Sequence, residues 1–150
     1  MCALTSKEVA LKFLQSHAFL TMATCSKTGI PNATPHEYGF HEPNVFLEIS
    51  KVHVSVANIL ENPVVHFEIH DLFTPETAQN AKVLQIFAEA KILYPNSPQF
   101  DSYWEKLTQQ FPYMKMFPKE TRVILVFHLK EGTLIEFSKT QLQRTIIDFK

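Results

Sequence analysis

Residues 58–65 read Asn58-Ile59-Leu60-Glu61-Asn62-Pro63-Val64-Val65, and the spacing of the apolar residues changes within them. Before this segment, helical spacing predicts a helix that Ser50 caps and that runs to about Glu61, with inward-facing side chains at Val52, Val56 and Ile59. Asn62-Pro63 stops the helix, and apolar and polar residues then alternate over Val64–His70. The segment therefore predicts a helix that passes directly into a strand.

Antiparallel strands are predicted on both sides of this junction. Upstream, three segments joined by short turns favour strands: Ala18–Cys25, Asn32–Phe40 and Val45–Ser50. Such turns join antiparallel neighbours, because a parallel pair needs a crossover of about a dozen residues. Downstream, we expect a long strand and then a hairpin around Lys130-Glu131-Gly132, with strand ranges Ala81–Leu93, Thr121–Leu129 and Thr133–Ser138.

Two further helices complete the predicted fold. Thr5 and Glu8 form a capping box for a helix from about Thr5 to Ser16. Ser97-Pro98 opens another helix, whose buried side holds Phe100, Trp104, Leu107 and Phe111. About seven strands and three helices predict one mainly β domain over residues 1–150, in which the antiparallel sheet closes into a small barrel to hide its edges.

Composition excludes several classes of protein. The 150 residues carry 14 basic and 15 acidic side chains, a net charge of -1, and Arg122 and Arg144 are the only arginines, which disfavours nucleic-acid binding. No apolar run approaches the roughly 20 residues that span a membrane, and the first residues lack a secretory signal pattern, so we expect a cytoplasmic protein. Cys2 and Cys25 lack the spacing of a zinc site or a disulfide framework.

Histidines are numerous, and three polar residues alternate along one predicted strand. His66, Glu68 and His70 share one face of Val64–His70. With about 3.3 Å of rise per residue, His66 and His70 lie about 13 Å apart, too far for two ligands of one ion. We therefore expect no metal site, and interpret this stripe as a polar sheet surface or a subunit contact.

The segment Ser50-Lys51-Val52-His53-Val54-Ser55 places hydroxyl, ammonium and imidazole groups at a predicted helix start. The free N–H groups and positive end of a helix favour an anion there. Ordinary capping by Ser50, with Lys51 and His53 in solvent, explains the same residues. A glycine-rich phosphate loop is excluded, because the chain has only Gly29, Gly39 and Gly132.

The order of these motifs is similar to that of a known family. The Gly29-Ile30-Pro31 turn into the second strand, the segment Val45–Ser50 and above all Asn58–Val65 resemble the pyridoxamine 5'-phosphate oxidase-like family of FMN-binding split β-barrels. The resemblance runs from about residue 5 to residue 137. It implies a six- to seven-stranded antiparallel split β-barrel with flanking helices, and a homodimer with two FMN sites at its interface.

The resemblance also implies a function and a set of cofactor-binding residues. It implies an FMN-binding oxidoreductase acting on a small organic substrate, and the positions that would bind FMN are Thr34, His36, Glu48, Ile49, Ser50, Lys51, His53 and Ser55. The family's usual phosphate-binding arginine falls at Thr34 and its usual lysine at Ser55. Lys51, His53 or the partner subunit's Arg122 would have to replace them. The alternative is a non-catalytic dimeric barrel that binds a flavin, or another cofactor such as haem or a deazaflavin.

Overall fold

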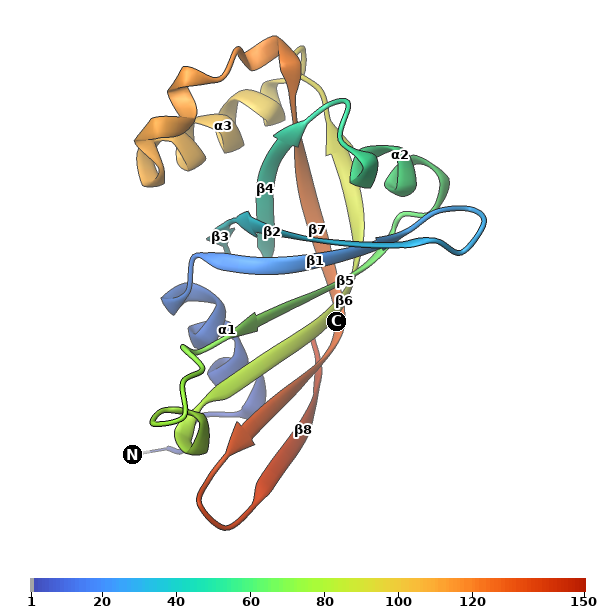
Figure 1. Ribbon diagram of the computed structural model, residues 1–150. Helices are drawn as coiled ribbons and strands as arrows, with labels where there is room; N and C mark the ends of the chain where they lie inside the picture. The colour runs from blue at the N-terminus through green and yellow to red at the C-terminus, as the bar shows by residue number, and fades with distance from the viewer. Residues whose placement is uncertain (1) are drawn as a thin grey trace.

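The computed structural model describes residues 2–150 and shows one strongly curled antiparallel sheet with helices around it (Figure 1). The helices are α1 (Ser6–Ser16), α2 (Val54–Glu61) and α3 (Pro98–Gln110), with short 3-10 turns η1 (Ala78–Asn80), η2 (Pro112–Met116) and η3 (Lys119–Thr121). The strands are β1 (Phe19–Cys25), β2 (Pro31–Glu37), β3 (Gly39–His41), β4 (Asn44–Ser50), β5 (Val64–His70), β6 (Lys82–Leu93), β7 (Arg122–Phe137) and β8 (Leu142–Asp148).

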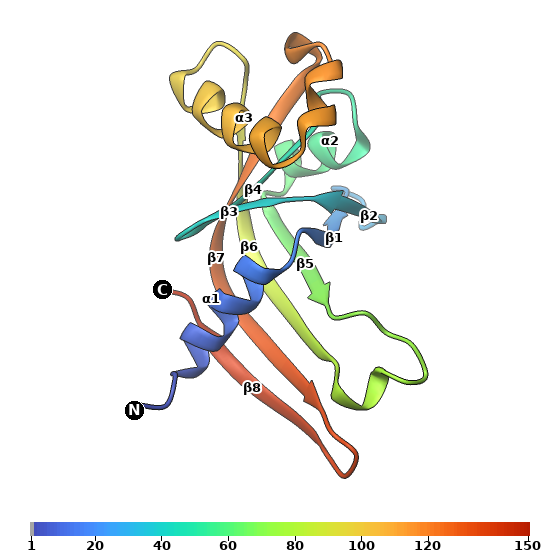
Figure 2. The same ribbon diagram turned by 90° about the vertical axis from the view of Figure 1, so that its left-hand side faces the viewer.

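The order of strands makes this sheet a split barrel. Strands pair in the order β2-β1-β5-β6-β7-β4-β3, with β8 added to the lower part of β7. Strands β2 and β3 follow one another in the chain yet lie at opposite ends of this order, so the sheet must curl to bring its ends together. Figure 2 shows β2 and β3 running as one ribbon across the other strands. The mainly β fold class, with antiparallel strands and flanking helices, is confirmed.

Two hydrophobic clusters hold the fold together. The main core lies inside the curled sheet and includes buried side chains of α1 and α2, such as Leu14 and Ile59. A second cluster joins α3 to β4, β6 and β7, with Phe100 and Leu107 fully buried and Trp104 and Phe111 packed against the cluster. The predicted inward face of α3 is thus confirmed. No helix within residues 2–150 has both the length and the apolar character needed to cross a membrane.

Helix α2 begins three residues later than predicted, because its N-cap is His53 and not Ser50. Ser50 is the last residue of β4 and pairs with Arg122, and the N–H of Lys51 still donates to the carbonyl of Thr121 at 3.0 Å. Pairing with β7 therefore keeps Ser50 extended, and His53 becomes the N-cap instead. Val52, predicted to face inward, lies in the turn and is 84% exposed, whereas Val56 and Ile59 are buried as expected.

The predicted second strand is broken at Tyr38. This residue is buried, its N–H donates to the carbonyl of Ala18 and its hydroxyl donates to the carbonyl of Leu14 at 2.6 Å. These bonds anchor the chain to the end of α1, so that β2 stays with β1 while β3 turns away to pair with β4. A Cβ at Gly39 would lie 2.5 Å from the ring of Phe46, so any other residue at the start of β3 would force this buried ring to move.

The predicted hairpin around Lys130-Glu131-Gly132 is wrong. Strand β7 runs straight through these residues, and the hairpin forms further on, between β7 and a strand in the tail, β8. A register shift leaves Lys130 as an extra residue opposite the Phe87–Ala88 step of β6. Gly132 is required by close packing, because a Cβ there would lie 2.9 Å from the carbonyl oxygen of Gln85.

We predict that Gly132→Ala lowers the free energy of unfolding by about 1–3 kcal/mol, because the added methyl group overpacks the contact between β6 and β7. The control is Glu131→Ala, an exposed neighbour on the same strand, which should change stability much less. Urea unfolding followed by circular dichroism measures both. Equal stability of Gly132→Ala and wild type would argue against the close approach.

Candidate functional site

The split of the barrel lies between two strand edges that lack partners within residues 2–150. Strand β2 pairs on one side only, with β1. Strand β4 pairs with β7 along Val45–Ser50, but β3 covers its other edge only at Asn44–Phe46. We call the free edge of β2 and the facing edge of Glu48–Ser50 the split. One hydrogen bond, from Asn32 to Ser55, and one ring contact, between His36 and His53, bridge it.

The backbone of β4 presents unpaired polar groups to the split. Antiparallel bonding alternates residue by residue, and Lys51 bonds to Thr121 of the β7 side, so the N–H and C=O groups of Glu48 and Ser50 point away from β7. The Ser50 carbonyl accepts from the His53 N–H at 3.0 Å. Within the described residues this leaves two N–H donors and one carbonyl, in the alternating order donor, acceptor, donor.

The β2 side of the split carries three polar side chains on one face. Asn32, Thr34 and His36 alternate with exposed Ala33 and Pro35, so all three project toward the barrel interior and α2. The Thr34 hydroxyl lies 2.7 Å from Nε2 of His36, and the amide of Asn32 donates to Oγ of Ser55 at 3.0 Å. Sequence analysis missed Asn32, although it stands at the same strand spacing as the two predicted residues.

Helix α2 brings two more predicted residues to the split. His53 caps the helix by accepting the N–H of Ser55 at its Nδ1, and Ser55 is completely buried. The helix is fixed to β1 by a buried hydrogen bond of 3.0 Å from the amide of Asn58 to the hydroxyl of Thr24. The conformation of residues 58–65 thus determines where His53 and Ser55 stand.

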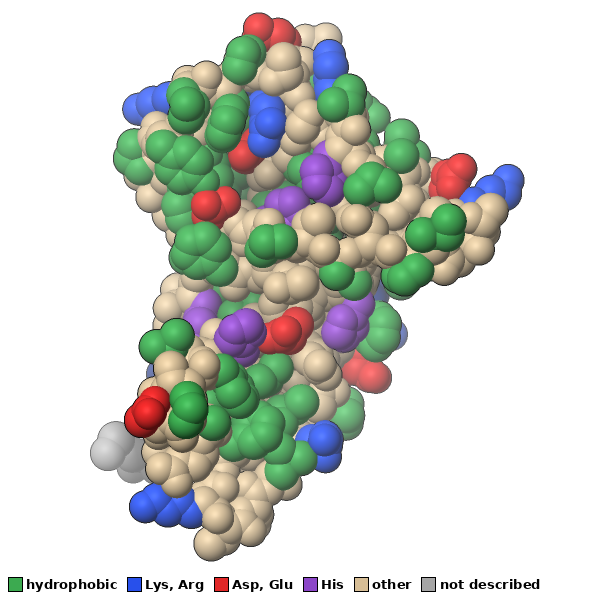
Figure 3. All heavy atoms as spheres, in the orientation of Figure 1, with side chains coloured by type: hydrophobic (Ala, Val, Ile, Leu, Met, Phe, Trp, Pro, Cys, Tyr) green, Lys and Arg blue, Asp and Glu red, His purple; other side chains and the backbone are tan. Residues whose placement is uncertain are grey.

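Two imidazoles face each other across the split. The ring centroids of His36 and His53 are 5.8 Å apart in an edge-to-face arrangement. Burial, and to a lesser extent the neighbouring His53, lowers the pKa of His36 to about 4. His36 is therefore neutral at physiological pH. Figure 3 shows histidine side chains at the surface just above β1 and β2.

Fixed positive charge near the split is neutralised. Arg122, at the start of β7, forms an ion pair with the buried carboxylate of Glu48 on β4 and lies over the ring of Phe117, with its guanidinium carbon 4.6 Å from the centroid. Lys51 is exposed in the turn between β4 and α2. Arg122 is thus held within its own chain, where its charge balances that of Glu48.

The predicted site residues fall into two groups in the structure. Thr34, His36, His53 and Ser55 come together, and the backbone of Ser50 borders them. The side chain of Ile49 points the other way, into the main core, where it is 3% exposed, so only its backbone could contact a ligand. That these residues bind a cofactor stays a prediction.

The outer face of the sheet carries the row of polar side chains that the sequence predicts on the strand Val64–His70. His66, Glu68 and His70 share one face of β5, and Nδ1 of His70 lies 2.6 Å from Oε1 of Glu68. His66 packs against Phe87, with the ring centroids 4.6 Å apart. Figure 3 shows a broad group of hydrophobic side chains below this polar row, over β5–β8. We call this the outer face; its large side chains include Phe19, Phe73, Val83, Phe87, Ile135 and Ile146.

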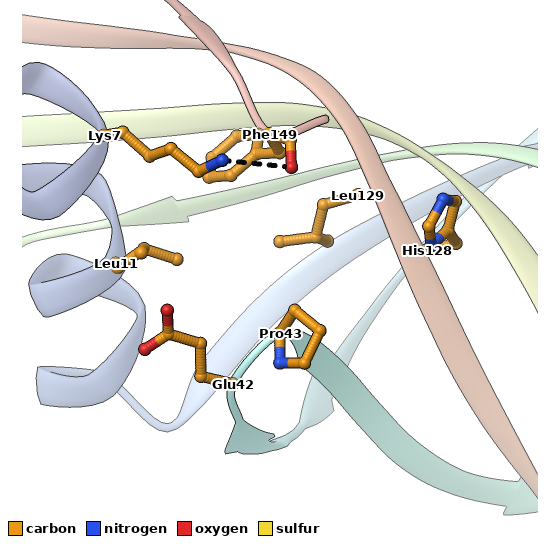
Figure 4. A pocket seen from close by; sticks show the side chains of 7 residues that line it. All are labelled: Lys7, Leu11, Glu42, Pro43, His128, Leu129 and Phe149. Carbon is orange, nitrogen blue, oxygen red and sulfur yellow. Dashed lines mark hydrogen bonds between the residues drawn. The ribbon is translucent and has the colours of Figure 1, made fainter.

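A small cavity of about 110 Å³ lies elsewhere, between α1, the β3–β4 turn and the chain end (Figure 4). Lys7 points toward residues 149–150 and donates to the carbonyls of Phe149 and Lys150, at 3.3 and 3.4 Å. Glu42 and His128 also line the cavity, beside the apolar side chains of Leu11 and Leu129. Residues 149–150 thus pack against α1 here through the bonds that Lys7 donates.

The sequence model of the family described as pyridoxamine 5'-phosphate oxidase matches residues 6–136. The chain belongs to the pyridoxamine 5'-phosphate oxidase family. The match covers α1 to β7 and so includes both sides of the split. No curated protein matches the chain significantly.

Solved structures share the fold of this family member at low sequence identity. A haem-binding protein from Mycobacterium smegmatis matches 97% of the chain with a TM-score of 0.80 and 14% identity, and the chain spans 59% of its length. HutZ, the haem storage protein from Vibrio cholerae, matches 91% of the chain over 100% of its own length, with a TM-score of 0.71 and 18% identity. A FAD-binding protein from Mesorhizobium loti matches 87% of the chain and 94% of its own length, with a TM-score of 0.69 and 16% identity.

The residues at the split are a poor match for the phosphate of FMN. The backbone edge of Glu48 and Ser50 offers neutral donor and acceptor groups. A phosphate monoester carries about -1.5 to -2 charges at pH 7, and the donors here are neutral: Thr34 bonds to His36, and Ser55 accepts from Asn32. The residues that the structure places here therefore do not form a cationic phosphate site.

We predict that the ring resonances of His36 titrate with a midpoint near pH 4. Because the folded chain holds this pKa below the unfolded value of about 6.5, the unfolded chain takes up the proton first as the pH falls. The free energy of unfolding should therefore decrease from about pH 6.5 to pH 4. NMR titration measures the midpoint, and His36→Gln should lose this part of the pH dependence. A midpoint at or above 6.5 would refute the assignment.

Proposed function

We propose that this family member is a homodimeric flavin-binding protein that holds the isoalloxazine ring in the split and acts as an oxidoreductase on a small organic molecule. The observation that carries the proposal is the free edge of β4, where Glu48 and Ser50 offer donor, acceptor and donor groups in a row. When bound, the flavin would supply hydride or electron transfer.

The neighbouring residues suit a planar ligand. Residues that are locked in place by their own hydrogen bonds, such as Thr34, His36 and Ser55, give the split fixed walls and little entropy to lose on binding. Neutral His36 and the capping His53 present two aromatic rings beside the backbone edge. These groups would orient a flavin ring and exclude water from one of its sides.

A second copy of the chain is the partner we propose for the outer face. Large apolar side chains gather there, and Phe87 is 54% exposed and Ile146 is 65% exposed. Broad exposed apolar surfaces of this kind mark interaction sites. In a dimer that packs two outer faces together, each copy would cover these apolar side chains of the other.

We predict that Ser50→Pro weakens flavin binding about tenfold, because it removes one N–H donor that points into the split. Proline is tolerated on a strand edge where its missing N–H faces away from the neighbouring strand, so the pairing of β4 with β7 should survive. Quenching of flavin fluorescence on titration measures the affinity. The matched control, Ser50→Ala, keeps the N–H and should bind like wild type.

Two outcomes of this titration count against the proposal. Equal flavin affinity of Ser50→Pro and wild type would show that the edge of β4 does not bind the flavin. Uptake of haemin, with no uptake of either riboflavin or FMN, would favour haem instead. Haem is the second candidate because His66 and His70 lie at the border of the apolar outer face, and because two structural neighbours are named as haem proteins.

We predict that Phe87→Asp converts the proposed homodimer into a monomer at micromolar concentration. The new carboxylate would be buried against the apolar outer face of the partner subunit. Met116→Glu is the matched control, since Met116 is 74% exposed on a different part of the surface. Sedimentation velocity measures both variants. If the wild type is itself monomeric, or if both variants stay dimeric, the outer face is not the contact.

A further inference from the structure

We infer that the split selects a flavin whose side chain ends in neutral hydroxyl groups, as in riboflavin, and gains no affinity from a terminal phosphate. This inference rests on the proposed function. It follows from the way the positions that could meet a phosphate are used in this chain: Thr34, Ser55 and His53 are bonded within the protein, Arg122 is paired with Glu48, and Lys51 is exposed.

The side chains at the two key positions are neutral and already bonded. Thr34 Oγ1 lies 2.7 Å from the His36 ring, and Ser55 Oγ lies 3.0 Å from the Asn32 amide. Ser55 is completely buried, so it contacts β2 rather than a ligand. Hydroxyl groups donate and accept at once, so a ribityl chain can bond to Thr34 and to the imidazole of His36, whereas a phosphate monoester carries few donors and needs cations.

The start of α2 offers little to an anion. His53 Nδ1 takes the N–H of Ser55, and the carbonyl of His53 takes the N–H of Val56 at 3.0 Å. Two of the N–H groups that give a helix start its affinity for anions are therefore used within the chain.

The nearby charges oppose a phosphate. The Glu48 carboxylate is buried next to the free edge, and Arg122 is committed to it. A phosphate approaching the guanidinium would have to compete with this ion pair and would meet the carboxylate. Lys51 lies on the exposed turn, where solvent screens its charge. The local field therefore favours an uncharged ligand end.

The test compares riboflavin with FMN by fluorescence quenching at low ionic strength. For wild type we expect the two dissociation constants to agree within about threefold, because no charge-assisted bond is gained. Thr34→Arg should strengthen FMN binding about tenfold or more relative to riboflavin, since it adds a cation beside His36 at the split. Thr34→Gln, of similar length and without charge, should leave the ratio unchanged.

Each outcome separates the inference from the function on which it rests. Wild type that binds FMN 30-fold or more tightly than riboflavin overturns the inference and leaves the flavin function intact. The same holds if Lys51→Ala weakens FMN binding alone, since Lys51 would then be the phosphate cation. Wild type that binds neither flavin overturns the proposed function, and the inference with it.

Discussion

The hydrogen bond from the Asn58 amide to the Thr24 hydroxyl is the contact on which the arrangement of the split depends. Both side chains are buried, and their bond of 3.0 Å links α2 to β1. A helix of eight residues has little stability of its own, so its place is decided by such contacts and by buried Val56 and Ile59. Because leaving the buried Asn58 amide unpaired would cost free energy, the helix has one strongly preferred position against β1.

This position of α2 also places the residues at its other end, Ser55 and His53. It sets Ser55 against Asn32 of β2 and His53 beside His36, so that one hydrogen bond and one ring contact tie β2 to α2. The same geometry leaves the edge of Glu48 and Ser50 open, since β3 turns away at Tyr38 and pairs no further along β4. Two sets of contacts therefore define the split. Asn58 fixes α2 to β1, and Tyr38 fixes the point at which the chain leaves β2 and turns toward β4.

Local patterns in the sequence predicted much of this fold, and the errors arise where distant segments decide the outcome. The capping box of α1, the alternation of β5 and β6 and the Ser97 cap of α3 depend on neighbours in the chain, and each was found. The start of α2 was misplaced because pairing with β7, more than 70 residues away, keeps Ser50 extended. Gly132 was interpreted as a turn, although its small size serves the contact with β6.

The candidate site shows the same division. Thr34, His36, His53 and Ser55 were predicted from the resemblance and meet in space, and Asn32 would follow from strand alternation once Thr34 and His36 are placed on one face. The ion pair between Glu48 and Arg122 joins strands far apart in sequence, and no local pattern in either strand signals it. Yet this pair decides whether the site carries net positive charge. Charge balance at a site is thus a property of the fold rather than of the motif.

Strand β2 links the split to the outer face through its period of two residues. Its inward residues Asn32, Thr34 and His36 line the split, while its outward residues Ala33 and Pro35 are exposed on the opposite side. A shift of one residue along β1 would exchange the two sets, so pairing with β1 fixes both surfaces together. In the proposed dimer, a partner pressing on the outward side of this edge strand would also hold its inward side chains in register with α2. Assembly and cofactor binding would then be coupled through a single strand.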